Sequence, residues 1–508
     1  MRGNTVNNKR IAKNTFVLYV RMILVMLVGL YTSRVVLQAL GINDFGLYNV
    51  IGGVVALFTF LRTSMEKCTQ RFLNVAMAKL DERTDRTFSV AVIIHICMAI
   101  IALVLAETIG LWFINTYIQI PNGREFAANC IYQTVVGGLI LTIITIPYSA
   151  CIIAHEKMGM FALISVIDCI INLLIAILLL KFSGDSLILY GCLVLIAGII
   201  NFLCYIIYCR FKFSETKLVF VKDKALYKKM LSYTSWTLLG HAMIIGTNQG
   251  NTILVNIFHG VAANAAMGVA NQVNRQVLNL TNNFQTAFNP QITKAYASGD
   301  YNYLKKLVYS TSKISFFMLS VVSIPLALNI DTILDIWLKE VPQYSDIFCI
   351  LMLSSGILQA LSAPLNFCVM ATGQIKWFQI VTGLVFLSDL IILYSLFSFG
   401  LPPTTAMWVK VSIMLVVVWV RLAFAQKEIE CISYKGYIKE VLWPIGISTT
   451  LCVLCALGAS YFISGIVSQI IVTTILIFSC IVIVYTVGLN REEKTMLIKI
   501  LKHKRNKQ

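Results

Sequence analysis

The residues of this 508-residue chain best placed to do chemistry are charged side chains inside apolar segments. Arg21, Arg34 and Arg275 are three of them. A charge near the centre of a bilayer costs roughly 2.5–3.5 kcal/mol, so such residues are expected to face water or a binding site. The planar guanidinium group offers a fork of donors that suits phosphate oxygens. Arg275 lies mid-segment, whereas Arg21 and Arg34 lie closer to segment ends and could instead reach the headgroups.

Amide side chains are concentrated around Arg275 and in the preceding segment, residues 233–256. A helix that faces lipid does not carry such a load of amides, so we expect these two segments to line a polar cavity, with tight polar helix packing as the alternative. Amides offer both hydrogen-bond donors and acceptors to a polar ligand. The candidates for this lining are Asn248, Gln249, Asn251, Asn271, Gln272, Asn274 and Asn282.

Two carboxylates and a lysine also lie inside apolar segments. Asp168 falls near the middle of residues 159–180, and Asp389 near the middle of residues 377–399. Lys410 lies on the next segment, at a depth similar to that of Asp389. Two interpretations stay open, namely a structural ion pair or coupling to a gradient of H+ or Na+.

These residues are carried by apolar segments that fill nearly the whole chain. The composition is 58% hydrophobic and 13% charged, which excludes a soluble protein with a single core. About 20 apolar residues are needed for a helix to cross a bilayer, and fourteen segments meet this length. The sequence therefore predicts an all-α integral membrane protein. The predicted spans are 15–38, 45–63, 88–113, 127–152, 159–180, 186–208, 233–256, 264–287, 314–337, 348–371, 377–399, 404–424, 441–463 and 467–488.

Lysine and arginine residues predict the orientation of these spans. Most of the 41 basic residues, Arg62 and Arg421 among them, fall on one side, and only Arg124, Lys181 and Lys339 fall on the other. The positive-inside rule then places both termini in the cytoplasm. The net charge of +18 is explained by this bias and by attraction to anionic lipids, so no nucleic-acid partner is expected.

An internal repeat relates the two halves of the first twelve spans. At an offset of 217 residues, Pro147 aligns with Pro364 and Cys151 with Cys368. Six spans per half is an even number, so the repeats should be parallel, with alternating access as the mechanism. The predicted parts are an N-terminal lobe (1–209), a basic cytoplasmic linker (210–231), a C-terminal lobe (232–425), two further spans (426–490) and a basic cytoplasmic tail (491–508).

Enzymatic and metal-binding patterns are missing from the sequence. It contains no GxxxxGK[ST], HExxH or GxSxG motif, and the predicted loops are too short for a soluble catalytic domain. Cys452 and Cys455 form a CxxC inside an apolar segment, and the five histidines do not cluster along the chain. We therefore predict a transporter with no cofactor and no metal site. A membrane-embedded polysaccharide polymerase is the rival from another class.

The turn after the first span carries a resemblance to a known family. Arg34-Val-Val-Leu-Gln-Ala-Leu-Gly41 is followed by Ile-Asn-Asp-Phe45-Gly46-Leu-Tyr48. This pattern resembles the LG and FG-x-Y signature of the polysaccharide transporters, or Wzx-type flippases, of the multidrug/oligosaccharidyl-lipid/polysaccharide (MOP) exporter superfamily. The resemblance covers nearly the whole chain, and it implies two parallel six-helix lobes like those of MATE exporters, followed by two C-terminal helices.

The resemblance also implies a function. Such a flippase moves undecaprenyl-pyrophosphate-linked sugar units from the cytoplasmic to the periplasmic leaflet of a bacterial inner membrane, for O-antigen, capsule or exopolysaccharide synthesis. Its expected partners are the lipid-linked oligosaccharide and membrane lipids, with a polysaccharide polymerase and glycosyltransferases as further candidates. Arg275, with Arg21 and Arg34 if they face inward, would hold the pyrophosphate. A multidrug cation antiporter and a lipid II flippase are the alternatives within the superfamily.

Overall fold

A computed structural model describes most of the chain, and the described residues form helices joined by turns and short loops. The described ranges are 2–56, 59–78, 84–117, 120, 123–338, 341–460, 466–490 and 493–494. The predicted basic tail, residues 491–508, thus lies almost wholly outside the described residues, as does the end of the predicted span 441–463.

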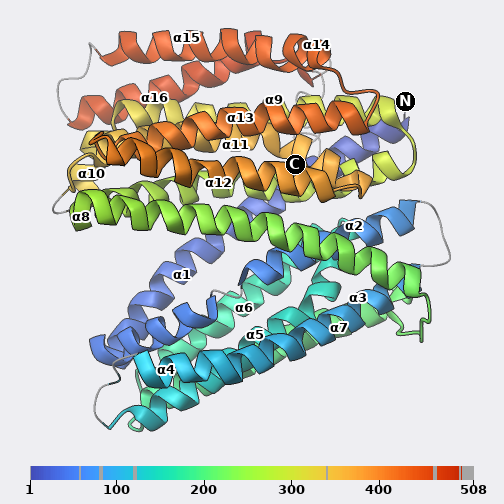
Figure 1. Cartoon of the computed structure of the whole chain (residues 1–508), viewed down its shortest axis with the longest axis vertical. Coiled ribbons are helices and arrows are strands. Elements are labelled where there is room, and N and C mark those ends of the chain that lie inside the picture. The colour runs from blue at the N-terminus through green and yellow to red at the C-terminus, as the bar shows by residue number, and fades with distance from the viewer. Residues whose placement is uncertain are drawn as a thin grey trace, which may run out of the picture. The chain divides into compact units, whose positions relative to one another are not determined.

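The helices belong to two compact units (Figure 1). The N-terminal unit comprises residues 13–238, and the C-terminal unit comprises residues 239–508 together with residues 1–12. Two long helices are each interrupted by a glycine. α1 (Arg2–Ala56) is broken at Gly41, and α8 (Lys224–Ala297) is broken at Gly260.

The N-terminal unit is built around α5 (Glu125–Ala154), which packs against α7 (Ser186–Lys212), α2 (Thr59–Ala78) and α3 (Thr84–Leu105). Small and branched side chains of α5, such as Ala128, Ile131 and Ile143, are fully buried in this core. The remaining elements are η1 (Ala106–Gly110), α4 (Leu111–Tyr117), α6 (Met158–Leu179) and η2 (Ser214–Thr216).

The C-terminal unit is built around α11 (Ser345–Thr372), which packs against α13 (Thr405–Glu428) and α9 (Tyr301–Leu328). α12 (Lys376–Ser398) packs on α13, and α15 (Trp443–Ser460) packs on α16 (Ile466–Ile483) and on α9. The remaining elements are α10 (Ile330–Trp337), α14 (Tyr434–Tyr437), η3 (Ile438–Leu442) and η4 (Val484–Gly488).

Eleven helical segments of the described residues are long and apolar enough to cross a membrane. The predicted spans 45–63, 233–256 and 264–287 are not among them, so a count of fourteen stays a prediction. The missing segments belong to α1, α2 and α8, and α8 is the helix that carries the amides. α2 and α8 also continue to Ala78 and Ala297, well beyond the predicted span ends.

Corresponding helices of the two halves end in the same way. α5 contains Pro147 and α11 contains Pro364, each a short distance before the end of its helix. A residue just after each helix has a positive φ, 58° at Glu156 and 83° at Gly373. These two residues are 217 apart, which is the offset of the sequence repeat.

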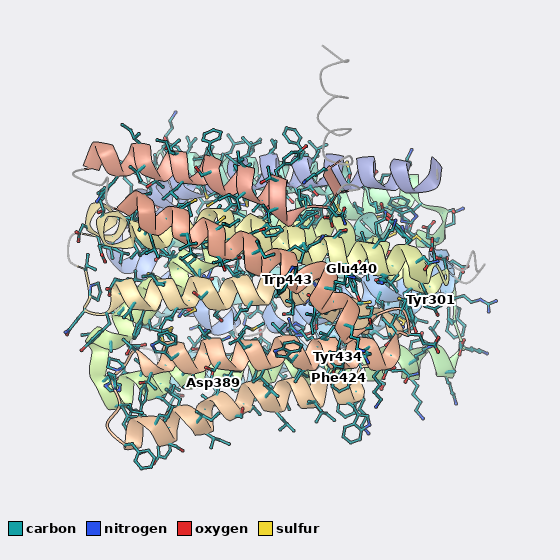
Figure 2. The ribbon with its side chains drawn as sticks, turned by 90° about the horizontal axis from the view of Figure 1, so that it is seen from above. Tyr301, Asp389, Phe424, Tyr434, Glu440 and Trp443 are labelled. Carbon is teal, nitrogen blue, oxygen red and sulfur yellow. The ribbon has the colours of Figure 1, made fainter. Side chains whose placement is uncertain are left out.

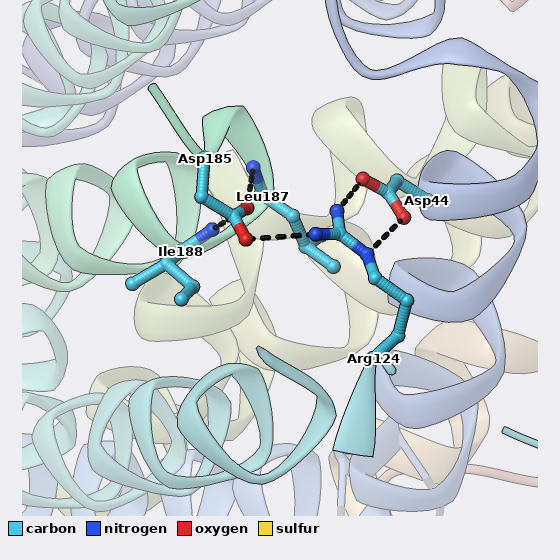
Figure 3. A network of polar contacts seen from close by, with 5 residues as sticks. All are labelled: Asp44, Arg124, Asp185, Leu187 and Ile188. Carbon is cyan, nitrogen blue, oxygen red and sulfur yellow. Dashed lines mark hydrogen bonds and ion pairs between the residues drawn. The ribbon is translucent and has the colours of Figure 1, made fainter. Parts of the chain in front are cut away.

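Arg124 joins three helices at one end of the N-terminal unit (Figure 3). It forms a bidentate ion pair with Asp44, on α1 beyond Gly41, and its Nη1 donates to Asp185 Oδ2 at 2.7 Å. Asp185 also caps α7, because its Oδ1 accepts from the backbone N–H of Leu187 and of Ile188. Arg124 thereby ties the starts of α5 and α7 to the part of α1 that follows Gly41.

Candidate functional site

A polar pocket of about 460 Å³ lies within the C-terminal unit. It is lined by both parts of α8 on either side of Gly260 and by α11, α12 and α13. Close helix contacts shape its walls, since a Cβ at Gly250 would meet the side chain of Leu390 on α12. A Cβ at Gly356 on α11 would likewise meet Asn274 of α8.

Amides and cations dominate the lining of this pocket. Arg275, a predicted cavity residue, lines it, and so does Lys410, which was predicted only as an ion-pair or ion-coupling residue. Five of the seven predicted amides also line it, namely Asn248, Gln249, Asn271, Asn274 and Asn282. Asn279, Gln359 and Ser355 add further polar groups. The pocket can therefore offer many neutral hydrogen-bonding groups together with positive charge.

Asp389 lies midway along α12 (Figure 2) and is 2% exposed. Its Oδ2 accepts a hydrogen bond from Asn251 Nδ2 at 2.9 Å, whereas its Oδ1 is buried with no hydrogen-bond partner. Lys410 Nζ donates to Asn248 Oδ1 at 3.2 Å and attracts the Asp389 carboxylate through space. Asn251 is thus buried behind the pocket as a partner of the carboxylate, and the other carboxylate oxygen is buried without a hydrogen-bond partner.

Arg421, on α13, is a third cation of this pocket. The residue is 8% exposed, and its Nη1 donates to Ser362 Oγ at 2.8 Å. Its Nε is buried without a hydrogen-bond partner. The ion pairs described for this unit, Lys305–Glu440 and Lys313–Glu493, involve none of the three pocket cations. Because a buried charge without a partner is costly, this guanidinium is suited to an anionic ligand.

A second pocket, of about 590 Å³, lies within the N-terminal unit. Arg21, Arg62 and Asp168 line it, and the Arg21 guanidinium lies 4.8 Å from the centre of the Phe161 ring. Its polar lining further includes Tyr48, Tyr190, Tyr205, Asn172 and Asn201. Cations again outnumber carboxylates among the lining residues, but amides are fewer than in the C-terminal unit.

Two predicted residues lie beside the pockets without lining them. Arg34 is exposed on α1 next to the pocket residue Ser33, and Gln272 is exposed on α8 next to Asn271. Their predicted roles in binding stay predictions.

Sequence reasoning missed Arg62 and Arg421 as pocket residues, because both were counted with the cytoplasmic positive charges. Arg62 lies in the first turn of α2, and this helix continues for sixteen residues beyond Arg62, to Ala78. Arg421 lies about two helical turns before the end of α13 at Glu428. The continuation of each helix past its apolar stretch was the missing signal.

Comparison with known proteins bears on the fold alone. No protein-family model and no curated protein matches the sequence. An outward-facing multidrug resistance MATE family transporter of the MOP superfamily is similar in structure, with a TM-score of 0.72 and 12% identity over 84% of this chain and 97% of that chain. A mutant MATE transporter gives a TM-score of 0.74 with the same identity and coverage.

A third similar structure is a MOP superfamily transporter from Pyrococcus furiosus, described as having a binding pocket of reverse polarity that suggests a different function. Its TM-score is 0.70 and its identity 12%, over 84% of this chain and 96% of that chain. The described helices and these similarities show that the chain is a multi-pass integral membrane protein with a MATE-like fold.

Proposed function

We propose that the protein is a flippase that moves a polyprenyl-pyrophosphate-linked oligosaccharide across a bacterial inner membrane by alternating access. The pocket of the C-terminal unit carries this proposal. Three cations, Arg275, Lys410 and Arg421, share it with a single carboxylate, Asp389, among a majority of neutral polar groups.

The chemistry of this lining matches both parts of such a headgroup. A pyrophosphate needs cationic donors, and charge-assisted hydrogen bonds from guanidinium groups are among the strongest that proteins make. Each sugar hydroxyl both donates and accepts, as the amides of Asn271, Asn274 and Asn282 do. A polyprenyl tail needs no polar site, because it can remain in the lipid while the headgroup moves.

The charge balance favours an anionic substrate over the drug cations of a multidrug antiporter. A cationic drug would need carboxylates in excess, whereas here they are outnumbered in both pockets. The Pyrococcus furiosus transporter, with its pocket of reverse polarity, is an example of a different pocket charge within this superfamily. The fold thus supports transport, and the pocket charge indicates the class of substrate.

Reconstitution into vesicles tests the proposal directly. The full chain is placed in liposomes that contain a fluorescent polyprenyl-pyrophosphate oligosaccharide, and translocation is read from protection of the headgroup against an added reductant. We expect flipping to be lost in Arg275→Ala and partly kept in Arg275→Lys, because the lysine retains the charge but not the fork of donors.

Arg210→Ala is the matched control, because Arg210 is exposed at the end of α7 and lines neither pocket. Normal flipping in Arg275→Ala, with correct membrane insertion, would overturn the assignment. The same assay with fluorescent lipid II in place of the lipid-linked oligosaccharide tests whether the protein is instead a lipid II flippase. If the wild-type chain flips no lipid-linked sugar but polymerises it, the polymerase is the correct function.

A further inference from the structure

A cluster of potential metal ligands lies in the N-terminal unit, away from the residues that line its pocket. Cys151 lies near the end of α5, His155 directly follows that helix, and Glu215 belongs to η2. One ligand atom from each of these side chains lies within 4.8 Å of the other two. The sequence analysis predicted no metal site, since only the folded chain brings Glu215 to the other two.

The imidazole of His155 is held between the other two side chains. Its Nε2 lies 2.8 Å from Glu215 Oε1, and its Nδ1 lies 3.8 Å from Cys151 Sγ. The ring stacks on Phe213 with a centroid distance of 4.0 Å. A carboxylate on one ring nitrogen is the usual arrangement when the other nitrogen binds a metal, because it fixes the tautomer and the ring orientation.

A second thiol lies beside the cluster. Cys209, near the end of α7, is fully buried, shares a hydrogen bond with Cys151, and its Sγ donates to the Tyr148 carbonyl oxygen at 3.5 Å. Both thiols are inaccessible, whereas the side chains of His155 and Glu215 are 24% and 16% exposed, so the cluster can be reached from the solvent on one side. A thiol and an imidazole are ligands that favour Zn²⁺ over Mg²⁺ or Ca²⁺.

The observed spacing is close to that of a tetrahedral site. Zinc–sulfur and zinc–nitrogen bonds of about 2.3 and 2.0 Å put the two ligand atoms about 3.5 Å apart at a tetrahedral angle. The Cys151 Sγ to His155 Nδ1 distance of 3.8 Å differs little from this value. His155 Nδ1 also lies 3.1 Å from the Cys151 carbonyl oxygen, so a protonated imidazole that merely closes the helix is the competing state.

The second half of the chain shows that closing this helix end does not require the cluster. Cys368 occupies the position of Cys151 at the end of α11, and Cys431 lies near it. Thr372 stands where the repeat offset would place His155, and Ile432 where it would place Glu215. The thiol of Cys151 is thus shared by both halves, but the imidazole and the carboxylate belong only to the first.

We propose that Cys151 and His155 bind a divalent cation of the Zn²⁺ class, with Glu215 orienting His155 or taking the third position. Binding releases the Cys151 thiol proton to the solvent, and the sulfur binds as a thiolate. The ion would fix the start of the segment between α7 and α8 to the end of α5. That segment is already held by a hydrogen bond from the Val219 N–H to Ser89 Oγ at 2.9 Å.

Cobalt substitution tests this proposal on the purified full-length protein. Metal is removed with a chelator and Co²⁺ is added under reducing conditions. We expect one equivalent to give thiolate-to-cobalt charge-transfer and tetrahedral d–d absorption bands that Zn²⁺ abolishes. Cys151→Ser and His155→Gln should lose the bands, and Glu215→Gln and Cys209→Ser, which remove contacts to the two ligands, should weaken binding about 10–100-fold.

Cys368→Ser is the matched control. This variant should bind Co²⁺ normally, because the end of α11 has Thr372 in place of the imidazole of His155. If a cysteine variant fails to fold, His155→Gln decides the matter, since glutamine retains hydrogen bonding to Glu215. Absence of thiolate-to-cobalt bands in the folded wild-type protein would overturn the proposal. So would bands that persist unchanged in His155→Gln and Cys151→Ser.

Discussion

Gly41 and Gly260 interrupt their helices with nearly the same backbone angles. Gly41 has φ 75° and ψ 171°, and Gly260 has φ 78° and ψ −173°. The two are 219 residues apart, close to the offset of the sequence repeat. Only glycine adopts this region readily, because a Cβ would clash with the backbone. Each half of the chain therefore makes the same turn between its first two helical segments.

Replacement of either glycine by alanine is expected to destabilise the protein by about 1–3 kcal/mol. The cost should be backbone strain alone, because no atom lies within 4 Å of a Cβ built at either position. Thermal unfolding in detergent measures it. Gly29→Ala and Gly246→Ala are matched controls within helices, with equally open surroundings, and should be neutral or slightly stabilising. Equal effects at all four positions would contradict the strain argument.

Arg421→Met is expected to lower substrate transport and to leave stability unchanged or increased. The substitution removes a buried guanidinium whose Nε lacks a partner, so the folded protein loses little. A bound pyrophosphate would lose a charge-assisted hydrogen bond, which corresponds to about a 10–100-fold weaker affinity. Affinity is measured with inorganic pyrophosphate and the purified protein, and stability by thermal unfolding. Unchanged affinity would exclude Arg421 from the anion site.

Much of the fold could be predicted from hydropathy, because lipid-facing helices are recognised by their long apolar sequences. The spans that stay predictions belong to α1, α2 and α8, whose polar stretches lower the mean hydropathy. Asn271, Asn274 and Arg275 line a pocket, where polar side chains carry no penalty. Hydropathy also gives no sign that α2 and α8 continue past residues 63 and 287, to Ala78 and Ala297.

Charges and amides inside apolar segments were the sequence signals for the candidate site. Arg21, Arg275 and Lys410 met that criterion and line pockets, as do five of the seven predicted amides, whereas Arg34 met it and lies beside its pocket. Arg62 and Arg421 did not, because they lie near the ends of apolar stretches, where basic residues usually mark the cytoplasmic side. The partnership of Asp389 with Asn251 was also hidden, since 138 residues separate them.

Asp389→Asn is expected to abolish the dependence of transport on a proton or sodium gradient while headgroup binding persists. The reason is that the Asp389 carboxylate has one oxygen without a partner, next to a pocket that contains Lys410. Transport in vesicles with and without each imposed gradient measures the effect. Asn251→Leu is the companion variant, because it removes the hydrogen bond to Asp389 but keeps the carboxylate. An unchanged gradient dependence in Asp389→Asn would leave Asp389 with a structural role only.

The pair of Arg124 with Asp185 predicts a dependence of stability on pH. Burial alone would raise the pKa of Asp185, but the hydrogen bond from Arg124 and those from the Ile188 and Leu187 N–H groups bring it below the ordinary value of 3.8. The unfolded chain therefore binds this proton more readily than the folded chain does. It follows that the pair stabilises the fold above that value and that this stabilisation is lost as the pH falls through the lower, folded-state pKa.

Arg124→Gln should accordingly lower the unfolding temperature at pH 7, and its deficit should shrink as the pH is lowered below about 4. The change is expected to be small, about 1 kcal/mol, because the side chains of Arg124 and Asp185 are 29% and 33% exposed and solvent screens their attraction. Asp185→Asn keeps the cap on α7 but not the charge, so it should reproduce the loss of pH dependence. A deficit that stays constant from pH 7 to pH 3 would show that Arg124 acts through packing instead of through its carboxylate partners.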